Sequence, residues 1–375
     1  MIYFDNASTT SVRPEVVRAY GTLLADYGNP DSLHQLGRKA HRNMEESRNR
    51  IASMLQISPE EVIFTGSASE ANTLALVGYA LANKSRGTHV ITSNVEHSSA
   101  AHSADFLEEL GFEVTRLPVN EKGVITPEAL KAAMRDDTIL VSLMHVNNEM
   151  GAINDIAALA DVVHEHPVCV FHSDCTQSFA KLDIPLEKLD MMTMSAHKIH
   201  GVKGSGMLVK KKKLKLHSIV QGGQQEQGLR GGTENYAANT ALAKTIRMAL
   251  EEKPAAQKRA AELRTYLLKE LSQIDGFTLL SPEDGIDGIM AFCFDSITSE
   301  VLLNALDAKG ICVSAKSTCS SHDSGANAVL LAMGRSMKEA THSIRVSFCA
   351  SNTLEEAQEF VRTIKEVINS YGLSL

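Results

Sequence analysis

The chain has 375 residues, of which 43% are hydrophobic and 22% are charged, and its formal net charge is −8. This length predicts two domains rather than one simple core, and the acidic balance argues against a protein that binds nucleic acid. No apolar run reaches the roughly 18 residues that span a bilayer, and the N-terminus lacks the basic flank and apolar core of a signal peptide, so we expect neither nucleic acid nor a membrane as a partner.

Between residues 60 and 210, short apolar runs alternate with amphipathic stretches. This alternation predicts an α/β domain around a mostly parallel sheet, with ligands bound at the carboxyl ends of the strands. The expected strands are 61–65, 89–92, 113–117, 139–146, 168–172, 191–195 and 205–209. The expected helices between them are 69–83, 98–110, 126–134 and 156–164.

Beyond residue 233 the pattern changes to two long helical stretches, 234–252 and 255–274, which Pro254 separates. A compact segment follows, and we interpret it as a smaller α+β domain. Its expected elements are strands at 288–294, 311–313 and 343–348 and a final helix at 354–370. We therefore expect a large domain made of residues 12–250 and a small domain made of residues 1–11 and 251–375.

Residues 64–72, FTGSASEAN, are typical of a strand, a turn of small residues and the start of a helix. Ser67 or Ser69 can cap this helix, whose free N–H groups and dipole favour an anion. The turn is not a Walker A loop, because no Gly-Lys-Ser/Thr follows. The pattern leaves two interpretations open, a phosphate site and an ordinary capped turn.

Residues 194–206, MSAHKIHGVKGSG, lie between two expected strands. Lys198 directly follows an apolar strand, where burial can lower its pKa and free its amine for Schiff-base chemistry. Ser195 and His197 flank it as candidate phosphate donors, and the glycines permit close approach of a cofactor. The alternative is a glycine-rich turn with an incidental lysine.

Residues 171–177, FHSDCTQ, end another apolar strand. Burying Asp174 there requires a cationic or hydrogen-bonding partner, and the protonated pyridine nitrogen of pyridoxal phosphate would serve. The alternative is a helix N-cap. Polar clusters at residues 96–97 and 147–149 follow two further strands on the same side of the sheet. The convergence of an anion site, a lysine, an acid, an imidazole and amides predicts a pyridoxal phosphate site.

These residues resemble the cysteine desulfurases of the NifS/IscS type, in the class V aminotransferase group of fold-type I pyridoxal phosphate enzymes. The matching segments run nearly end to end. They are YFDNASTT (3–10), GNPDSLHQLGRKA (28–40), FTGSASEAN (64–72), EH (96–97), HVNNEMGAI (145–153), HSDCTQS (172–178), SAHKIHGVKGSG (195–206), LRGGTEN (229–235) and SIRVS (343–347). The resemblance implies conversion of L-cysteine to L-alanine, with the sulfur transferred as an enzyme persulfide. The sulfur would serve iron–sulfur cluster assembly, tRNA thiolation or cofactor biosynthesis.

The resemblance also implies how the cofactor ring is held. Lys198 matches the lysine that binds the cofactor covalently and takes the substrate α-proton, and Asp174 matches the partner of the pyridine nitrogen. His97 matches the imidazole stacked on the ring. Contacts to the phenolate oxygen of the ring are implied for Gln177 and Asn148.

Phosphate and substrate contacts follow from the same resemblance. The implied phosphate pocket contains Ala68, Ser69, Ser195 and His197. Thr233 matches a residue that reaches the phosphate of the neighbouring subunit, which implies a homodimer with shared active sites. Asn29 and Arg345 match positions that hold the substrate carboxylate.

Cys319 lies in SAKSTCSSHDSG (314–325), a polar stretch between apolar runs. A free cysteine is usually a small buried hydrophobe, so this stretch alone leaves open a working nucleophile and a chance thiol. The resemblance implies the persulfide-forming nucleophile, and Lys316 or His322 could favour its thiolate. Relatives usually carry Ser-Gly-Ser-Ala-Cys there, so Lys316 departs from the pattern and is expected to stiffen the backbone or to steer an acidic acceptor.

Two rival functions remain at this point. A selenocysteine lyase or another class V enzyme need not carry a loop cysteine, so Cys319 favours desulfuration. A catalytically silent sulfur carrier or scaffold would not need the lysine, acid and histidine set. The six cysteines show no CxxC spacing and no zinc-like pairing with histidines, so we expect no metal site and a cytoplasmic protein with free thiols. The expected partners are L-cysteine and a sulfur-acceptor protein that the sequence does not identify.

Overall fold

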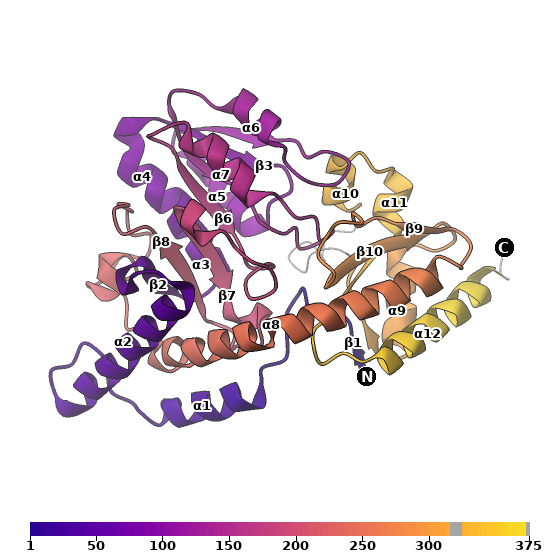
Figure 1. Cartoon of the computed structure of the whole chain (residues 1–375), viewed down its shortest axis with the longest axis horizontal. Helices are drawn as coiled ribbons and strands as arrows, with labels where there is room; N and C mark the ends of the chain where they lie inside the picture. The colour runs from indigo at the N-terminus through magenta and orange to yellow at the C-terminus, as the bar shows by residue number, and fades with distance from the viewer. Residues whose placement is uncertain (316–324, 373–375) are drawn as a thin grey trace.

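A computed structural model describes residues 1–315 and 325–372, and its larger part is built on a seven-stranded sheet (Figure 1). The strand order is β2-β8-β7-β6-β5-β3-β4. The strands are β2 (Val62–Thr65), β3 (His89–Ser93), β4 (Glu113–Leu117), β5 (Thr138–Ser142), β6 (Val170–Asp174), β7 (Met191–Ser195) and β8 (Gly206–Lys210). Pairs from β4 to β7 are parallel, and β8 runs antiparallel to both β7 and β2. The predicted mostly parallel sheet is therefore confirmed.

Both faces of this sheet are buried. Alternate residues of a strand point to opposite faces, and in β2 Val62 and Phe64 join one apolar core whereas Ile63 joins another. The helices that connect the strands are α3 (Ala68–Thr73), α4 (Tyr79–Asn83), α5 (Ser98–Glu109), α6 (Pro127–Ala133) and α7 (Ile156–His164). Such double burial explains why the strands read as continuous apolar runs.

The expected helix at 69–83 is interrupted. A π-helical turn at Leu74–Gly78 separates α3 from α4. At this turn the backbone of Gly78 lies close to that of His217, whose N–H donates to the Gly78 carbonyl at 2.8 Å. A Cβ at position 78 would lie 2.7 Å from the His217 carbonyl oxygen, so glycine permits this close approach.

A single helix, α8 (Tyr236–Leu271), stands where two helices separated by Pro254 were predicted, so the predicted break is wrong. A proline inside a helix costs about 3 kcal/mol, but Pro254 is exposed and both halves of α8 are packed. The N-terminal half contacts α1 (Pro14–Leu24) and α2 (Gln35–Leu55), two helices that were not predicted, and the C-terminal half contacts α12 (Leu354–Gly372). Packing at both ends outweighs the local cost.

The C-terminal residues form a second core around a three-stranded antiparallel sheet of order β12-β10-β9. These strands are β9 (Phe277–Leu279), β10 (Ile289–Phe294) and β12 (Ser343–Ser347), and the nearby helices are α9 (Ser299–Asp307), α10 (Ala328–Ala332) and α11 (Met337–His342). The N-terminal strand β1 (Ile2–Tyr3) pairs here with β11 (Ile311–Cys312), and the last helix, α12, lies on the same side (Figure 1). The proposed domain boundaries stay a prediction. No helix within residues 1–315 and 325–372 has an apolar stretch long enough to cross a membrane.

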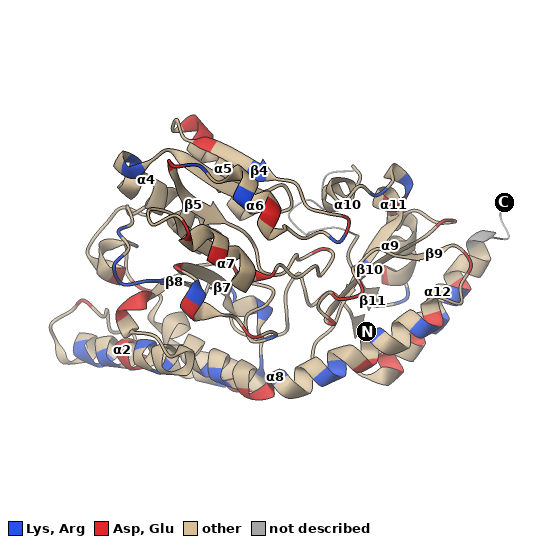
Figure 2. Cartoon of the chain, turned by 45° about the horizontal axis from the view of Figure 1, so that its top comes forward, with Lys and Arg blue, Asp and Glu red and all other residues tan. Residues whose placement is uncertain are grey.

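An ion pair at the edge of the large sheet is buried, whereas many other charged residues lie along the outer helices α2, α8 and α12 (Figure 2). Arg48 and Glu226 form two parallel hydrogen bonds of 2.8 and 2.9 Å. Arg48 also donates to the Val62 carbonyl, and Glu226 accepts from the Phe64 N–H at 2.8 Å. The pair thus satisfies the outer backbone groups of the edge strand β2 and joins it to α2.

We expect Glu226→Ala to lower the free energy of unfolding by about 3–5 kcal/mol, because buried Arg48 would lose its two-bond partner and keep only the single ion-pair contact of Nε with the partly exposed Glu45. Glu251→Ala is the matched control, since Glu251 pairs with Arg247 on an exposed helix surface and such pairs contribute about 0.5 kcal/mol or less. Urea denaturation measures both changes. Equal losses in the two variants would contradict the structural importance of the Arg48–Glu226 pair.

Candidate active site

A cavity of about 210 Å³ lies at the edge where β6 and β7 end. Its walls come from the loops after these strands, from the first turn of α3 and from the N-terminal segment. The predicted site residues that line it are Ala68, Ser69, His97, Asn148, Asp174, Gln177, Ser195, His197, Lys198 and Arg345. The structure therefore brings together residues that are as much as 277 positions apart in the sequence (68 to 345), and their individual roles stay predictions.

One end of the cavity is suited to an anion. Of the two serines expected to cap α3, Ser67 is the cap, because its Oγ accepts from the Glu70 N–H at 3.2 Å. The first-turn N–H groups of Ala68 and Ser69 have no acceptor within the helix. A Cβ at Gly206 would lie 2.9 Å from the carbonyl carbon of Ser67, so this glycine lets β8 lie against the turn. Backbone donors here can surround a phosphate.

Asp174 ends β6 and is only 6% exposed. Its Oδ2 accepts from Asn72 Nδ2 at 2.7 Å, and its Oδ1 accepts from the Thr176 N–H at 2.9 Å. Within the described residues no cationic side chain pairs with it. Because a buried carboxylate needs a counter-charge, a protonated ring nitrogen in the cavity would complete this arrangement.

His97 has a defined protonation pattern. Its Nδ1 accepts from the Ser99 N–H at 3.2 Å and lies 2.8 Å from Ser99 Oγ, which also accepts from Asn72 Nδ2 at 2.9 Å. A backbone N–H can only donate, so Nδ1 carries no proton. Burial lowers the pKa of His97, which favours the neutral ring. The proton of His97 therefore resides on Nε2.

Asn72 and Ser99 were not predicted as site residues. Asn72 donates both amide hydrogens, one to Asp174 and one to Ser99, and so connects the carboxylate with the imidazole. Each residue lies within three positions of a residue that was identified, Ser69 or His97. A search for small polar residues on the helices after β2 and β3 could have found them.

Lys198 lies on a 3-10 turn (Ala196–Lys198) directly after β7. Burial, followed by the nearby cations Lys181 and Arg345, lowers the pKa of Lys198 to about 7. Its Nζ donates to the carbonyl oxygens of Ala7 and Ser8. A large fraction of this amine is therefore uncharged near neutral pH, as a nucleophile or base requires.

Arg345 brings the C-terminal sheet to the cavity. It lies in β12 and is only 2% exposed. Its Nη2 donates to Asp5 Oδ1 at 2.9 Å and to Ser8 Oγ at 2.7 Å, and its Nη1 donates to the Asn148 carbonyl at 2.8 Å. These contacts fix the guanidinium beside the cavity, and its buried Nε has no hydrogen-bond partner among residues 1–315 and 325–372.

Three predicted site residues are not placed in this cavity. Asn29 is exposed, and its Oδ1 accepts from the Asp31 N–H at 2.9 Å. Thr233 is exposed and is not among the lining residues. Cys319 and its neighbours Lys316 and His322 lie outside the described residues.

The cavity fits pyridoxal phosphate. It combines backbone donors for a phosphate, a carboxylate without a cation, a neutral imidazole and an amine with a lowered pKa. Gln177 adds an amide that is fixed by donation from Nε2 to the Ala7 carbonyl at 2.9 Å. Each group corresponds to one part of the cofactor: the phosphate, the pyridine nitrogen, the ring face, the aldehyde and the phenolate.

Comparisons with known proteins extend over almost the whole chain. Residues 2–360 match the family described as aminotransferase class-V. The chain is 40% identical to a NifS/IcsS protein homolog of Lactobacillus delbrueckii subsp. bulgaricus, over 99% of this chain and 98% of that protein. It is 37% identical to Cysteine desulfurase IscS of Dictyoglomus turgidum, over 98% of this chain and 94% of that protein.

Solved structures show the same likeness. A NifS-like protein superimposes with a TM-score of 0.92 at 33% identity, covering 98% of this chain and 99% of that one. SspA in complex with cysteine superimposes with a TM-score of 0.83 at 30% identity, covering 94% and 100% of the two chains. The predicted fold-type I architecture is thereby confirmed.

We expect Asn72→Ala to weaken binding of pyridoxal phosphate about tenfold or more, because Asp174 would lose a hydrogen bond worth about 1.5–3 kcal/mol. Asn83→Ala is the matched control, since Asn83 is also buried and hydrogen-bonded but lies away from the cavity. Titrating the cofactor-free proteins and following visible absorbance gives both dissociation constants. Equal weakening in the two variants would show that Asn72 acts only through general stability.

The rate at which the cofactor-free protein takes up pyridoxal phosphate covalently should fall as the pH drops below about 7. Protonated Lys198 has no lone pair for attack on the aldehyde, and the lowered pKa of Lys198 sets the midpoint. Stopped-flow absorbance across this pH range measures the rate, with Lys198→Arg as the control that cannot form the bond. A midpoint near the ordinary lysine pKa would contradict the prediction.

Proposed function

The chain belongs to the class-V aminotransferase family, and we propose that it is a pyridoxal phosphate-dependent cysteine desulfurase, which converts L-cysteine to L-alanine and retains the sulfur as a persulfide. Its resemblance to the NifS/IscS type is confirmed by relatives of that name along nearly the full chain. The observation that carries the proposal is one cavity lined by Lys198, Asp174 and Arg345. The cysteine bound to SspA supports the choice of substrate.

Different residues of the cavity hold the cofactor, hold the substrate and remove the α-proton. When bound, pyridoxal phosphate draws electron density away from the substrate α-carbon through its protonated ring. Asp174, held by two hydrogen bonds, stabilises the positive charge on the ring nitrogen. Lys198 Nζ removes the α-proton, because its lowered pKa leaves it uncharged near pH 7. Arg345 holds the substrate carboxylate through charge-assisted hydrogen bonds, while His97 keeps its proton on Nε2.

Sulfur transfer is assigned to Cys319, on the resemblance alone, because this residue lies outside the described part of the chain. Its thiolate attacks the sulfur of the substrate, an S–S bond forms, and the C–S bond breaks. The electron pair stays with the carbon skeleton, which is then protonated to give alanine. Burial raises the pKa of Cys175 to about 12 and that of Cys293 to about 11, so these thiols stay protonated and are poor nucleophiles.

The persulfide sulfur then passes to an acceptor protein, and we propose that the enzyme acts as a homodimer with shared active sites. The exposed position of Thr233, outside the cavity of its own chain, supports a role in the site of a second subunit. A cytoplasmic location is supported by the free cysteines in the described residues, which suit a reducing compartment.

We expect Cys319→Ser to reduce alanine formation from L-cysteine by about a thousandfold, because the nucleophile of a two-step transfer is removed. Cys349→Ser is the control, since Cys349 is a partly exposed thiol in the described residues. Amino-acid analysis measures alanine, and mass spectrometry detects the added sulfur on the Cys319 peptide. Full activity in Cys319→Ser, or loss only in Cys349→Ser, would contradict the assignment.

A further inference from the structure

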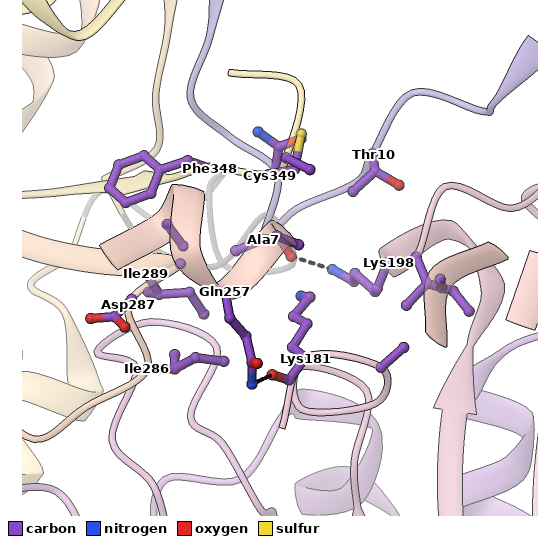
Figure 3. A pocket seen from close by; sticks show the side chains of 18 of the residues that line it. Ala7, Thr10, Lys181, Lys198, Gln257, Ile286, Asp287, Ile289, Phe348 and Cys349 are labelled. Carbon is purple, nitrogen blue, oxygen red and sulfur yellow. Dashed lines mark hydrogen bonds between the residues drawn. The ribbon is translucent and has the colours of Figure 1, made fainter. Parts of the chain in front are cut away.

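A second cavity, of about 360 Å³, lies where the two cores of the chain meet. It shares Ala7 and Lys198 with the active-site cavity, but much of its wall comes from α8 and from the segments 180–182, 285–289 and 348–350 (Figure 3). Much of this wall is aliphatic or aromatic, as at Ile286, Ile289 and Phe348. The size and apolar lining are those of a site for a small molecule.

Two cationic side chains in this cavity, Lys181 and Arg13, have hydrogen-bond donors that the described residues do not use. The Lys181 side chain reaches into it beside Gln257 and Lys198 (Figure 3). Its Nζ donates to Gln177 Oε1 at 3.2 Å, and it has no acidic partner within the described residues. Arg13 pairs with Glu252 through Nη2 at 2.5 Å, whereas its buried Nη1 has no hydrogen-bond partner in the part of the chain that the structure describes.

The charge of Lys181 is not compensated by its surroundings. Burial lowers its pKa to about 8, so the amine is mostly protonated at neutral pH in a largely apolar wall. The other titratable groups that line the cavity are Arg13, Lys198, His200, Glu252, Asp287 and Cys349. Glu252 is engaged by Arg13, and Asp287 lies 4.0 Å from Arg264. A bound anion would therefore supply the missing counter-charge.

We propose that this cavity binds a small monocarboxylate with a short aliphatic chain. The carboxylate accepts a hydrogen bond from Lys181 Nζ, and the aliphatic chain lies against Ile286, Ile289 and Phe348. A second carboxylate would lie against the apolar wall formed by Ile286, Ile289 and Phe348, which offers it no counter-charge. An amino acid would bring its ammonium group close to Lys181, so the substrate itself is a poor ligand for this cavity.

Binding at Lys181 is coupled to the active site through hydrogen bonds. Lys181 donates to Gln177, Gln177 donates to the Ala7 carbonyl, and Lys198 donates to the same carbonyl. A carboxylate bound to the Lys181 ammonium weakens the hydrogen bond from Nζ to Gln177 Oε1, and Gln177 lines the cofactor cavity. This coupling rests on the proposed function, whereas binding itself does not.

Isothermal titration of the holoenzyme with hexanoate tests the binding, with 1-hexanol as the uncharged match. We expect Lys181→Met to weaken hexanoate binding at least about tenfold, as for loss of a hydrogen bond to a charged group. Lys188→Met is the control, because Lys188 pairs with Asp161 outside the cavity. Equal affinity of the wild type and Lys181→Met would overturn the site, and equal affinity for 1-hexanol would overturn the carboxylate class.

Neighbouring alanines on α8 provide a second, charge-neutral pair of variants. Ala256 lines the cavity, whereas Ala255 is exposed and does not. We expect Ala256→Leu to fill the space and weaken hexanoate binding, and Ala255→Leu to bind like the wild type. Binding should also weaken as the pH rises above about 8, where Lys181 loses its charge. Unchanged binding in Ala256→Leu would overturn the location.

Competition with L-cysteine separates this site from the active site. Hexanoate bound at Arg345 would compete with cysteine and survive Lys181→Met, and that result would overturn the inference. Saturating hexanoate should change the visible spectrum of the wild-type holoenzyme but not of Lys181→Met, and no change in the wild type would overturn the coupling. Hexanoate binding without desulfurase activity would overturn only the proposed function, and activity without binding only this inference.

Discussion

The buried carboxylate of Asp174 is the constraint on which the active site depends. It lies at the end of a central strand, holds two hydrogen bonds and lacks a cation among the described residues, so a positive ligand group opposite it would supply the missing counter-charge. The hydrogen bonds from Asn72 extend this constraint through Ser99 to His97. Asp174 therefore accepts one amide hydrogen of Asn72, and the backbone N–H of Ser99 keeps the proton of the imidazole on Nε2. The central sheet holds this network rigidly, because strands buried on both faces have little freedom to shift.

The N-terminal segment joins the two cores at the point where the chemistry occurs. Asp5 and Ser8 hold Arg345 from the C-terminal sheet, and the Ala7 carbonyl accepts from Gln177 and Lys198 of the large sheet. The residues proposed to hold the substrate carboxylate and the cofactor therefore all contact one short stretch of backbone. The two cavities lie on either side of the same contacts, so a change in one alters hydrogen bonds that the other uses.

The sequence was sufficient to predict features that depend on local pattern. The apolar runs at 113–117 and 191–195 are strands with those bounds, and Asp174 and Lys198 were found because each follows such a run. Features set by distant contacts were missed or mistaken. Continuity of α8 through Pro254 depends on packing against α1, α2 and α12, and the contact of Lys181 with Gln177 depends on side-chain direction. The roles of Asn72 and Ser99 needed coordinates, since residues of their type are common on helices and only their distances from Asp174 and His97 distinguish them.

The long helix α8 belongs to both cores, since Leu242 and Ile246 pack in one and Leu263 and Leu267 pack in the other. Both ends of α8 are therefore held by packing, one in each core. Pro254 has no N–H, so the helix lacks one hydrogen bond near its middle and bends most easily there. We expect a rotation of one core against the other to bend α8 at this turn, which carries Glu252, Ala256 and Gln257 of the second cavity wall. How easily this one turn bends would therefore set how far the second cavity can widen or narrow while the sheet beside it keeps its position.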